Sequence, residues 1–322
     1  MSVSYFAGID VSKPHLDVHI LPSNTAERLP NTRAGHRRLV KLLREFDVCL
    51  IVLEATGGYE RQAVIAMVNA GLSVHVAQPQ IVHAFAVSLK ARAHNDQIDA
   101  RLCARYAQDR HQDLKVVEPI DKNQQTLQAL TIRRGQLVDM QTMELNRAQQ
   151  VHDKQALSSL RRSLKHLKKE IDRIEKQIDA LIAADAKLKA KSEKLQAVKG
   201  VGPQTTRTLL AHLPELGKVT VKRLNALVGV APYAADSGDK SFPRHIAGGR
   251  TLVRNGLYMA CMSAIYTNPV LMPYYQQLIA RGLAHKTAMM ACIRKLLAYL
   301  DKQIRAIEPT PAKIPLIQPE CV

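Results

Sequence analysis

Aromatic residues and cysteines are scarce in this 322-residue chain, and their scarcity excludes several kinds of protein. The sequence has no Trp, four Phe and nine Tyr. Proteins that grip single-stranded nucleic acid by stacking bases on aromatic rings usually carry more, so that binding mode is disfavoured. The five cysteines stand singly, which excludes a zinc ribbon or finger and indicates thiols in a reducing cytoplasm: Cys49, Cys103, Cys261, Cys292 and Cys321.

Long apolar runs and acidic residues are also in short supply. The longest nearly continuous apolar stretch, Leu257 to Tyr266, has about half the length needed to cross a bilayer, and no signal peptide is evident. We therefore expect a cytoplasmic protein without a membrane partner. The chain has 28 Asp and Glu residues and 46 Lys and Arg residues, which gives a formal net charge of +18. This excess favours nucleic acid over an anionic membrane surface as partner, because neutralised phosphates release counterions.

Proline is absent between Pro119 and Pro203, and glycine occurs there only as Gly135 and, close to the end, Gly200 and Gly202. Such a segment is predicted to be almost entirely helical. Within it, apolar residues alternate steps of four and three, the a/d pattern of a coiled coil: Leu160, Leu164, Leu167, Ile171, Ile174, Ile178 and Leu181. The partner of this seam is left open. Either the preceding helical stretch around residues 127–140 folds back onto it, or a second copy of the chain packs against it.

Acidic residues stand at the ends of predicted elements in the first part of the chain. Up to about residue 115, apolar strand patterns and helical patterns alternate, which predicts an α/β layer. Asp10 and Glu54 each end an apolar run. Asp96 and Asp99 open a predicted helix, and their spacing places both carboxylates on one face. Taken singly, such acids are more often helix caps or turn formers.

Together these four acids suggest a metal centre. Element ends of an α/β sheet are where such folds bind ligands, so the carboxylates are expected to converge. Carboxylate oxygens are suitable ligands for Mg²⁺, and Mn²⁺ is expected to substitute. Four of them can hold two ions about 3.5–4 Å apart, which clamp the attacking and leaving oxygens of a phosphodiester.

A glycine-containing turn opens the last third of the chain. Gly200-Val201-Gly202 precedes a helical pattern, with Lys199 and Arg207 beside it. Such a turn presents backbone N–H groups and a helix N-terminus to a phosphate, as in a helix-hairpin-helix element. We therefore predict nucleic-acid contacts at Lys199, Gly200, Gly202 and Arg207. The alternative is an ordinary turn between two helices.

Residues 233–250 break the helical pattern. A loop of this length inside a helical domain is uncommon unless it is functional. It contains Ser237 before a glycine, and Lys240, Arg244 and Arg250 are available to bind phosphates. Ser237 is therefore a candidate nucleophile, although a loop serine is more often a turn residue.

Several short motifs, taken in their order and separations, resemble a known family over nearly the whole chain. They are Gly8-Ile9-Asp10, Leu53-Glu54-Ala55-Thr56-Gly57-Gly58-Tyr59, Asn95-Asp96-Gln97-Ile98-Asp99-Ala100, Gly200-Val201-Gly202, Leu227-Val228-Gly229-Val230-Ala231-Pro232, Asp236-Ser237-Gly238, Gly248-Gly249-Arg250 and Leu257-Tyr258-Met259. In these motifs the chain resembles the DEDD transposases of insertion sequences, which include bridge-RNA-guided recombinases and Piv-type DNA invertases.

The resemblance implies a division of the chain into four parts. Residues 1–118 would form an RNase H-like (RuvC-like) α/β domain, and residues 119–194 a helical coiled-coil linker. Residues 195–307 would form an all-α transposase domain with the helix-hairpin-helix-like turn and the serine loop. Residues 308–322 would be a Pro-rich tail.

The resemblance also assigns roles. It implies that Asp10, Glu54, Asp96 and Asp99 hold Mg²⁺, and that Ser237 attacks DNA and becomes covalently linked to it. It further implies a non-coding guide RNA, action at the bacterial nucleoid, and a dimer or tetramer in which one subunit's serine can complete another's carboxylate site. After Ser237 the sequence departs from the RNA-guided members, which leaves Ser241 as an alternative nucleophile.

Two other readings of the sequence stay open. In a hydrolytic RNase H-like nuclease of the junction-resolvase type, the carboxylates would activate water and Ser237 would be a turn residue. In a non-catalytic coiled-coil protein, the basic charge would serve nucleic-acid binding alone.

Overall fold

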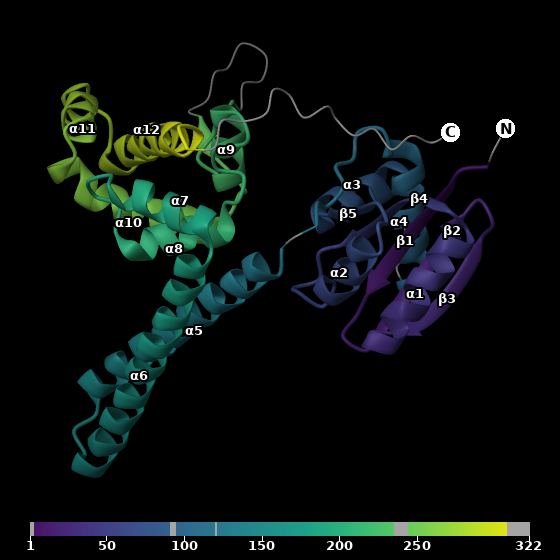
Figure 1. Cartoon of the computed structure of the whole chain (residues 1–322), viewed down its shortest axis with the longest axis horizontal. Coiled ribbons are helices and arrows are strands. Elements are labelled where there is room, and N and C mark those ends of the chain that lie inside the picture. Colours follow the sequence, from purple (N-terminus) through teal and green to yellow (C-terminus); the bar gives the residue numbers. More distant parts are fainter. Residues whose placement is uncertain (1–2, 91–94, 120, 235–243, 308–322) are drawn as a thin grey trace. The chain divides into compact units, whose positions relative to one another are not determined.

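The structure is a computed structural model of the chain (Figure 1), and it describes residues 3–90, 95–119, 121–234 and 244–307. The chain forms two compact units, which divide between residues 120 and 121. Each unit has its own buried core. None of the helices in the described ranges is long and apolar enough to cross a membrane.

The first unit is built on a mixed five-stranded sheet with the strand order β3-β2-β1-β4-β5. The strands are β1 (Tyr5–Val11), β2 (His15–Leu21), β3 (Thr25–Pro30), β4 (Val48–Glu54) and β5 (Val74–Ala77). The first three form an antiparallel meander, whereas β4 runs parallel to β1 and β5 runs parallel to β4. The expected α/β architecture of this part of the chain is confirmed, and the mixed sheet is compatible with an RNase H-like fold.

Helices cover both faces of this sheet. They are α1 (Arg33–Glu45), α2 (Arg61–Asn69), α3 (Pro79–Ser88) and α4 (Asp96–Arg110). Side chains of a strand alternate between the two faces, so each face has its own cluster of buried residues. Leu39 of α1 and Met67 of α2 pack with Ile51 on one face. Cys103 of α4 packs with Leu50 and Val52 on the other.

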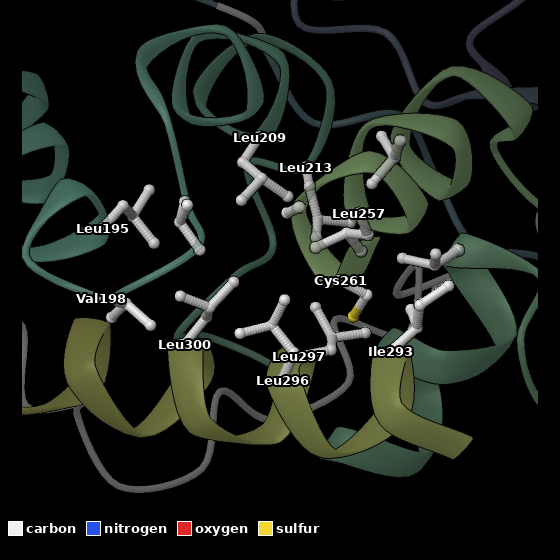
Figure 2. Packing of buried hydrophobic residues seen from close by; sticks show 14 of the residues in the cluster. Leu195, Val198, Leu209, Leu213, Leu257, Cys261, Ile293, Leu296, Leu297 and Leu300 are labelled. Atoms are coloured by element: carbon white, nitrogen blue, oxygen red, sulfur yellow. The ribbon is translucent and has the colours of Figure 1, made fainter. Parts of the chain in front are cut away.

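The second unit is helical apart from one short β-ladder. Its elements are α5 (Lys122–Gln150), α6 (Lys154–Ala184), α7 (Ala186–Gln196), α8 (Pro203–His212), α9 (Val221–Val228), β6 (Pro232–Tyr233), β7 (His245–Ile246), α10 (Thr251–Thr267), α11 (Leu271–Ala280) and α12 (His285–Arg305). The last helix presents an apolar stripe to the centre of the unit. Figure 2 shows Ile293, Leu297 and Leu300 of this stripe pointing toward Leu257 and Leu213, and all five are buried.

The heptad seam pairs with α5 of the same chain. The two long helices α5 and α6 lie side by side (Figure 1). Ile171, Ile174 and Ile178 are buried in one cluster with Leu127 and Leu137 of α5. Of the two partners that the sequence allowed, the preceding helix α5 therefore packs against the second half of the seam, from Ile171 to Ile178.

The end of the seam was predicted one residue too early. Ile182 is buried, whereas the expected Leu181 is only half-buried. A straight helix has 3.6 residues per turn, so an apolar face drifts relative to a strict seven-residue repeat. The first three seam positions, Leu160, Leu164 and Leu167, are also only half-buried.

Candidate active site

Strand register brings Asp10 and Glu54 together. In β1, alternation places Phe6, Gly8 and Asp10 on the face that α4 covers. The neighbouring strand β4 is parallel, and Ile9 lies opposite Leu53, so Asp10 and Glu54 follow as the next pair at the same sheet edge. Both acids are half-buried. The prediction that the two apolar runs end at one place in the sheet agrees with this register.

The close packing of α4 on β1 depends on Gly8. A Cβ atom at this position would lie 2.0 Å from the Ala100 carbonyl oxygen and 2.1 Å from the Ala104 nitrogen. These are backbone atoms of α4, so no side chain can swing aside to make room. Glycine at this position therefore lets the helix axis approach the strand closely.

The first turn of α4 then carries Asp96 and Asp99 to the end of β1. The helix begins after Asn95, whose side-chain oxygen accepts a hydrogen bond from the Ile98 backbone N–H at 2.8 Å. The alternative for the two aspartates was helix capping, and Asn95 fills that role. Asp96 and Asp99 lie in the first turn of the helix, where the helix dipole favours negative charge.

The charges of the four predicted acids interact. Burial, followed by the charges of Asp96 and Asp99, raises the pKa of Asp10. Burial, followed by the charges of Asp10 and Asp99, raises the pKa of Glu54. A carboxyl group whose pKa is raised by folding destabilises the fold as the pH rises through that range, because its charged form is less favourable there than in the unfolded chain. A bound cation would remove this cost.

The oxygen atoms fit a hard divalent cation. Carboxylate oxygens of Asp10, Asp17 and Asp96 all lie within 4.8 Å of one another. Mg²⁺ and Ca²⁺ are bound by oxygen atoms at about 2.0–2.6 Å, so one ion can span such a group. The first unit therefore holds a candidate metal centre around Asp10, Asp17 and Asp96. Of the four predicted acids, Glu54 and Asp99 lie outside this three-residue group, but their charges interact with that of Asp10.

Asp17 belongs to this cluster and was not predicted from the sequence. It is buried in the middle of β2, with an exposed fraction of 4 %. It stands directly opposite Asp10 in the antiparallel pair of β1 and β2. In the sequence, Asp17 stands between the apolar residues Leu16 and Val18, as a polar residue of an alternating strand does. Only the pairing of β1 with β2 shows that it lies next to Asp10.

A substitution at Gly8 should displace the helix that carries two of the acids. In the Gly8→Ala variant, the new methyl group forces α4 away from β1. Overpacking of this kind costs about 1–3 kcal/mol of unfolding free energy. A shift of about 1 Å in catalytic groups costs about a hundredfold in rate. We therefore expect Gly8→Ala to lose about 1–3 kcal/mol of unfolding free energy, measured by urea unfolding. We also expect its cleavage rate to fall by about a hundredfold, measured by single-turnover DNA cleavage.

The matched control is Gly135→Ala in α5. Apart from its chain neighbours and the backbone of its own helix, no described atom lies within 4 Å of a Cβ added at Gly135. Alanine is favoured over glycine inside a helix by about 1 kcal/mol, so this variant should be as stable as the parent or more so. A fully active Gly8→Ala protein would contradict the role of close helix packing.

In the second unit, Gly200 has a packing role. It adopts a φ of +96°, and a Cβ atom there would lie 2.5 Å from the Ala264 Cβ of α10. The backbone oxygen of Lys199 accepts a hydrogen bond from the Asn268 side chain at 3.0 Å. Gly202 is the N-cap residue of α8. The turn thus holds α8 against α10, as an ordinary helix turn does, while the Lys199 side chain is exposed.

The geometry does not favour Arg207 as a phosphate contact. Its Nε and Nη2 atoms donate to Asp179 at 2.8 and 2.6 Å, and Nη1 lies 3.0 Å from Glu175 of the same helix, α6. Only 11 % of its side chain is exposed. Burial alone would lower the pKa of Arg207, but the hydrogen bonds and charges of these two acids raise it. Arg207 therefore ties α8 to α6.

Arg250 is held in a similar way. Its Nη1 and Nη2 atoms each lie 2.6 Å from an oxygen of Glu215, and Nη1 also donates to the His212 carbonyl at 2.9 Å. Although burial alone would raise the pKa of Glu215, the hydrogen bonds and charge of Arg250 lower it. The expectation that Arg250 binds phosphate overlooked this acid, which approaches only in the folded chain.

Glycines build the base of the serine loop. β6 and β7 pair antiparallel, with Tyr233 opposite His245, so the chain leaves and re-enters the helical unit at one place. Next to β7 in the sequence, a Cβ added at Gly249 would lie 2.2 Å from the Gly229 nitrogen, so the two backbone segments pack closely there. Arg254 donates to the Gly248 carbonyl at 2.7 Å.

Three predicted residues, Ser237, Lys240 and Ser241, lie outside the described residues. Arg244, at the other end of the loop, is described and exposed.

Comparison with known proteins identifies the class of enzyme to which this chain, with its acidic group in an α/β unit and its helical second unit, belongs. A family model described as a transposase of the DEDD IS110 type matches residues 7–154. A second, described as the transposase IS116/IS110/IS902 family, matches residues 192–276. Together they span more than two thirds of the chain. The chain belongs to the IS110-type transposases and is a DNA recombinase, which confirms the resemblance noted in the sequence.

Two relatives match almost from end to end. They are the pilin gene-inverting proteins of Moraxella bovis and Moraxella lacunata. Each is 24 % identical to this chain over 328 aligned residues, which cover 98 % of this chain and 99 % of the relative. The similarity therefore includes both units.

Proposed function

We propose that this transposase cuts and rejoins DNA by attack of Ser237 on a phosphodiester, with Mg²⁺ held by Asp10, Glu54, Asp96 and Asp99. The convergence of the acids carries the proposal. β1, β4 and α4 come from separate parts of the sequence, and each brings acid to the same sheet edge. Like charges are expensive to gather in this way unless a cation is bound among them.

The chain's own residues position the reacting groups. Asp10 and Glu54 are fixed by strand pairing, and Asp96 and Asp99 by the packing of α4 over Gly8. Divalent ions held by these carboxylates would supply positive charge that stabilises the phosphate under attack and helps the serine to lose its proton. The Ser237 oxygen forms a bond to phosphorus as the bond to the departing strand breaks, and that strand takes up a proton. The phosphoserine ester keeps the energy needed for rejoining.

The names of the relatives favour rejoining over hydrolysis. The two Moraxella proteins are described as inverting a pilin gene. Inversion of a DNA segment needs strands to be joined again, which a nuclease that uses water does not do. This observation supports the recombinase reading above the junction-resolvase alternative.

The proposal includes further partners. The net charge of +18 supports binding of a non-coding guide RNA through its backbone, in addition to the element ends and target DNA. Lys199, Lys240 and Arg244 are the basic residues that we retain for nucleic-acid contacts. We also propose a homo-oligomer, a dimer or tetramer, acting at the nucleoid in the cytoplasm.

The proposed domains are an RNase H-like domain (1–118), a coiled-coil linker (119–194), a transposase domain (195–307) and a tail (308–322). The boundary between the two compact units lies close to the end of the first of these.

The test is a denaturing gel of the wild-type protein incubated with DNA carrying the element ends and with RNA recovered from the cell. In Mg²⁺ we expect labelled DNA to migrate with the protein as a covalent adduct, and in EDTA we expect none. Free nicked DNA without an adduct, in the presence of Mg²⁺, would support the nuclease instead.

A further inference from the structure

One basic residue contacts the candidate metal centre directly. Arg28 of β3 donates from Nε to Asp17 Oδ1 at 2.8 Å and from Nη2 to Asp17 Oδ2 at 3.0 Å. The same Nη2 donates to Asp96 Oδ2 at 2.7 Å. The guanidinium thus joins the buried carboxylate of β2 to the first turn of α4.

Strand register explains why these groups meet. Asp10 lies opposite Asp17 in the pairing of β1 and β2, and Asp17 lies opposite Arg28 in the pairing of β2 and β3. Residues directly opposite each other on one face are neighbours, so the three form a row across the sheet. Asp96 reaches the basic end of this row from α4.

The burial of Asp17 makes a counter-charge necessary. Its side chain is 5 % exposed, whereas that of Arg28 is 51 % exposed. A buried carboxylate is very costly without a partner, and a two-point contact with arginine satisfies both of its oxygens. Arg28 therefore uses Asp17 as an anchor while its outer side remains in contact with water.

The same contact affects the metal site. Oxygens of Asp10, Asp17 and Asp96 are close enough together for one ion to bind all three. While Arg28 is in place, both Asp17 oxygens and the Asp96 Oδ2 atom are engaged by a cation that belongs to the protein. The number of carboxylate ligands and their total charge set the affinity of an oxygen site for a divalent ion.

We propose that Arg28 is a positioning residue that competes with the divalent ion for Asp96 and keeps Asp17 out of its ligand set. The proposal rests on the proposed function of the four acids as metal ligands. Arg28 holds Asp96 over the sheet when the ion is absent, and it lowers the affinity of the site so that ions exchange. Asp17 acts through Arg28 and does not touch the ion.

The test is a titration of the purified full-length protein with Mn²⁺, followed by electron paramagnetic resonance. In Arg28→Gln the site gains one net negative charge and Asp17 is released, so we expect Mn²⁺ to bind roughly tenfold more tightly, as for one unit charge at about 5 Å in water. The Mg²⁺ concentration that gives half-maximal cleavage should fall by a similar factor. Arg28→Lys keeps the charge and should stay within about twofold of the wild type.

Two further variants make the result specific. Arg28→Gln combined with Asp17→Asn removes the released ligand and should return the affinity to near the wild-type value. The matched control is Arg38→Gln, which breaks the ion pair of Arg38 with Glu27 on the same unit and should leave Mn²⁺ binding unchanged. Unchanged or weaker Mn²⁺ binding in a folded Arg28→Gln protein would overturn the proposal.

Asp10→Asn separates this inference from the proposed function. If Asp10→Asn binds Mn²⁺ as well as the wild type does, the metal centre itself is wrong. If Asp10→Asn loses binding and Arg28→Gln does not change it, only the role of Arg28 is wrong. If Arg28→Gln does not fold, a Mn²⁺-bound structure of the wild type decides: displacement of Arg28 from Asp96 supports the competition, and retention of the 2.7 Å contact overturns it.

Discussion

Asp10→Asn is expected to lower the rate of DNA cleavage by about a thousandfold or more. Asp10 lies on β1, at the point where β4 and α4 also deliver acids. Asparagine has nearly the same shape, but it lacks the charge that holds a divalent ion. Metal assistance is worth several kcal/mol of transition-state stabilisation, and each 1.36 kcal/mol corresponds to a factor of ten. The measurement is single-turnover cleavage of labelled DNA in Mg²⁺.

Stability separates this effect from misfolding. The pKa of Asp10 is raised by burial and by its acidic neighbours, so its charge destabilises the metal-free fold at neutral pH. Asp10→Asn should therefore be at least as stable as the wild type in EDTA, as measured by urea unfolding. The control is Asp109→Asn on α4, whose carboxylate pairs with Arg105 at 3.0 Å. Cleavage within tenfold of the wild type in Asp10→Asn would contradict the metal assignment.

Ser237→Ala is expected to abolish the covalent protein–DNA adduct and the rejoining of strands. Alanine removes the oxygen that forms the bond to phosphorus, and no other group replaces it in the proposed reaction. The proposed metal centre lies in the other compact unit, so Mn²⁺ binding should be unchanged. The measurement is the same denaturing gel, with recombinant product counted by sequencing.

Ser241→Ala is the matched control for this variant. It removes a hydroxyl four residues away in the same loop. We expect it to form the adduct at the wild-type level. If Ser241→Ala loses the adduct and Ser237→Ala keeps it, the nucleophile has been assigned to the wrong serine. If Ser237→Ala still nicks DNA at the wild-type rate, water is the nucleophile.

The predicted acids illustrate what local pattern can establish. Asp10 and Glu54 were predicted because each ends an apolar run, and the parallel pairing of β1 and β4 brings these two ends together. Asp96 and Asp99 were predicted because a spacing of three places them on one helix face, and both lie in the first turn of α4. Both patterns lie within short segments, so they can be predicted from the geometry of a single strand or helix.

Residues that depend on tertiary register were missed. Asp17 and Arg28 join the site only because two antiparallel pairings align them with Asp10. Their sequence neighbourhood is an ordinary alternating strand.

The two arginines have partners that the sequence did not reveal, for a related reason. Arg207 and Arg250 stood in basic surroundings in the sequence, but Asp179 and Glu215 approach them in the folded helical unit. Net charge therefore describes the protein as a whole, whereas the partner of an individual basic side chain depends on the fold.

The most direct measurement is anomalous diffraction from a crystal of the full-length protein soaked in Mn²⁺. The account predicts peaks among the carboxylates of Asp10, Glu54, Asp96 and Asp99, with two ions about 3.5–4 Å apart, and Arg28 moved off Asp96. Mn²⁺ bound elsewhere, with the four carboxylates free of metal at a saturating concentration, would contradict it.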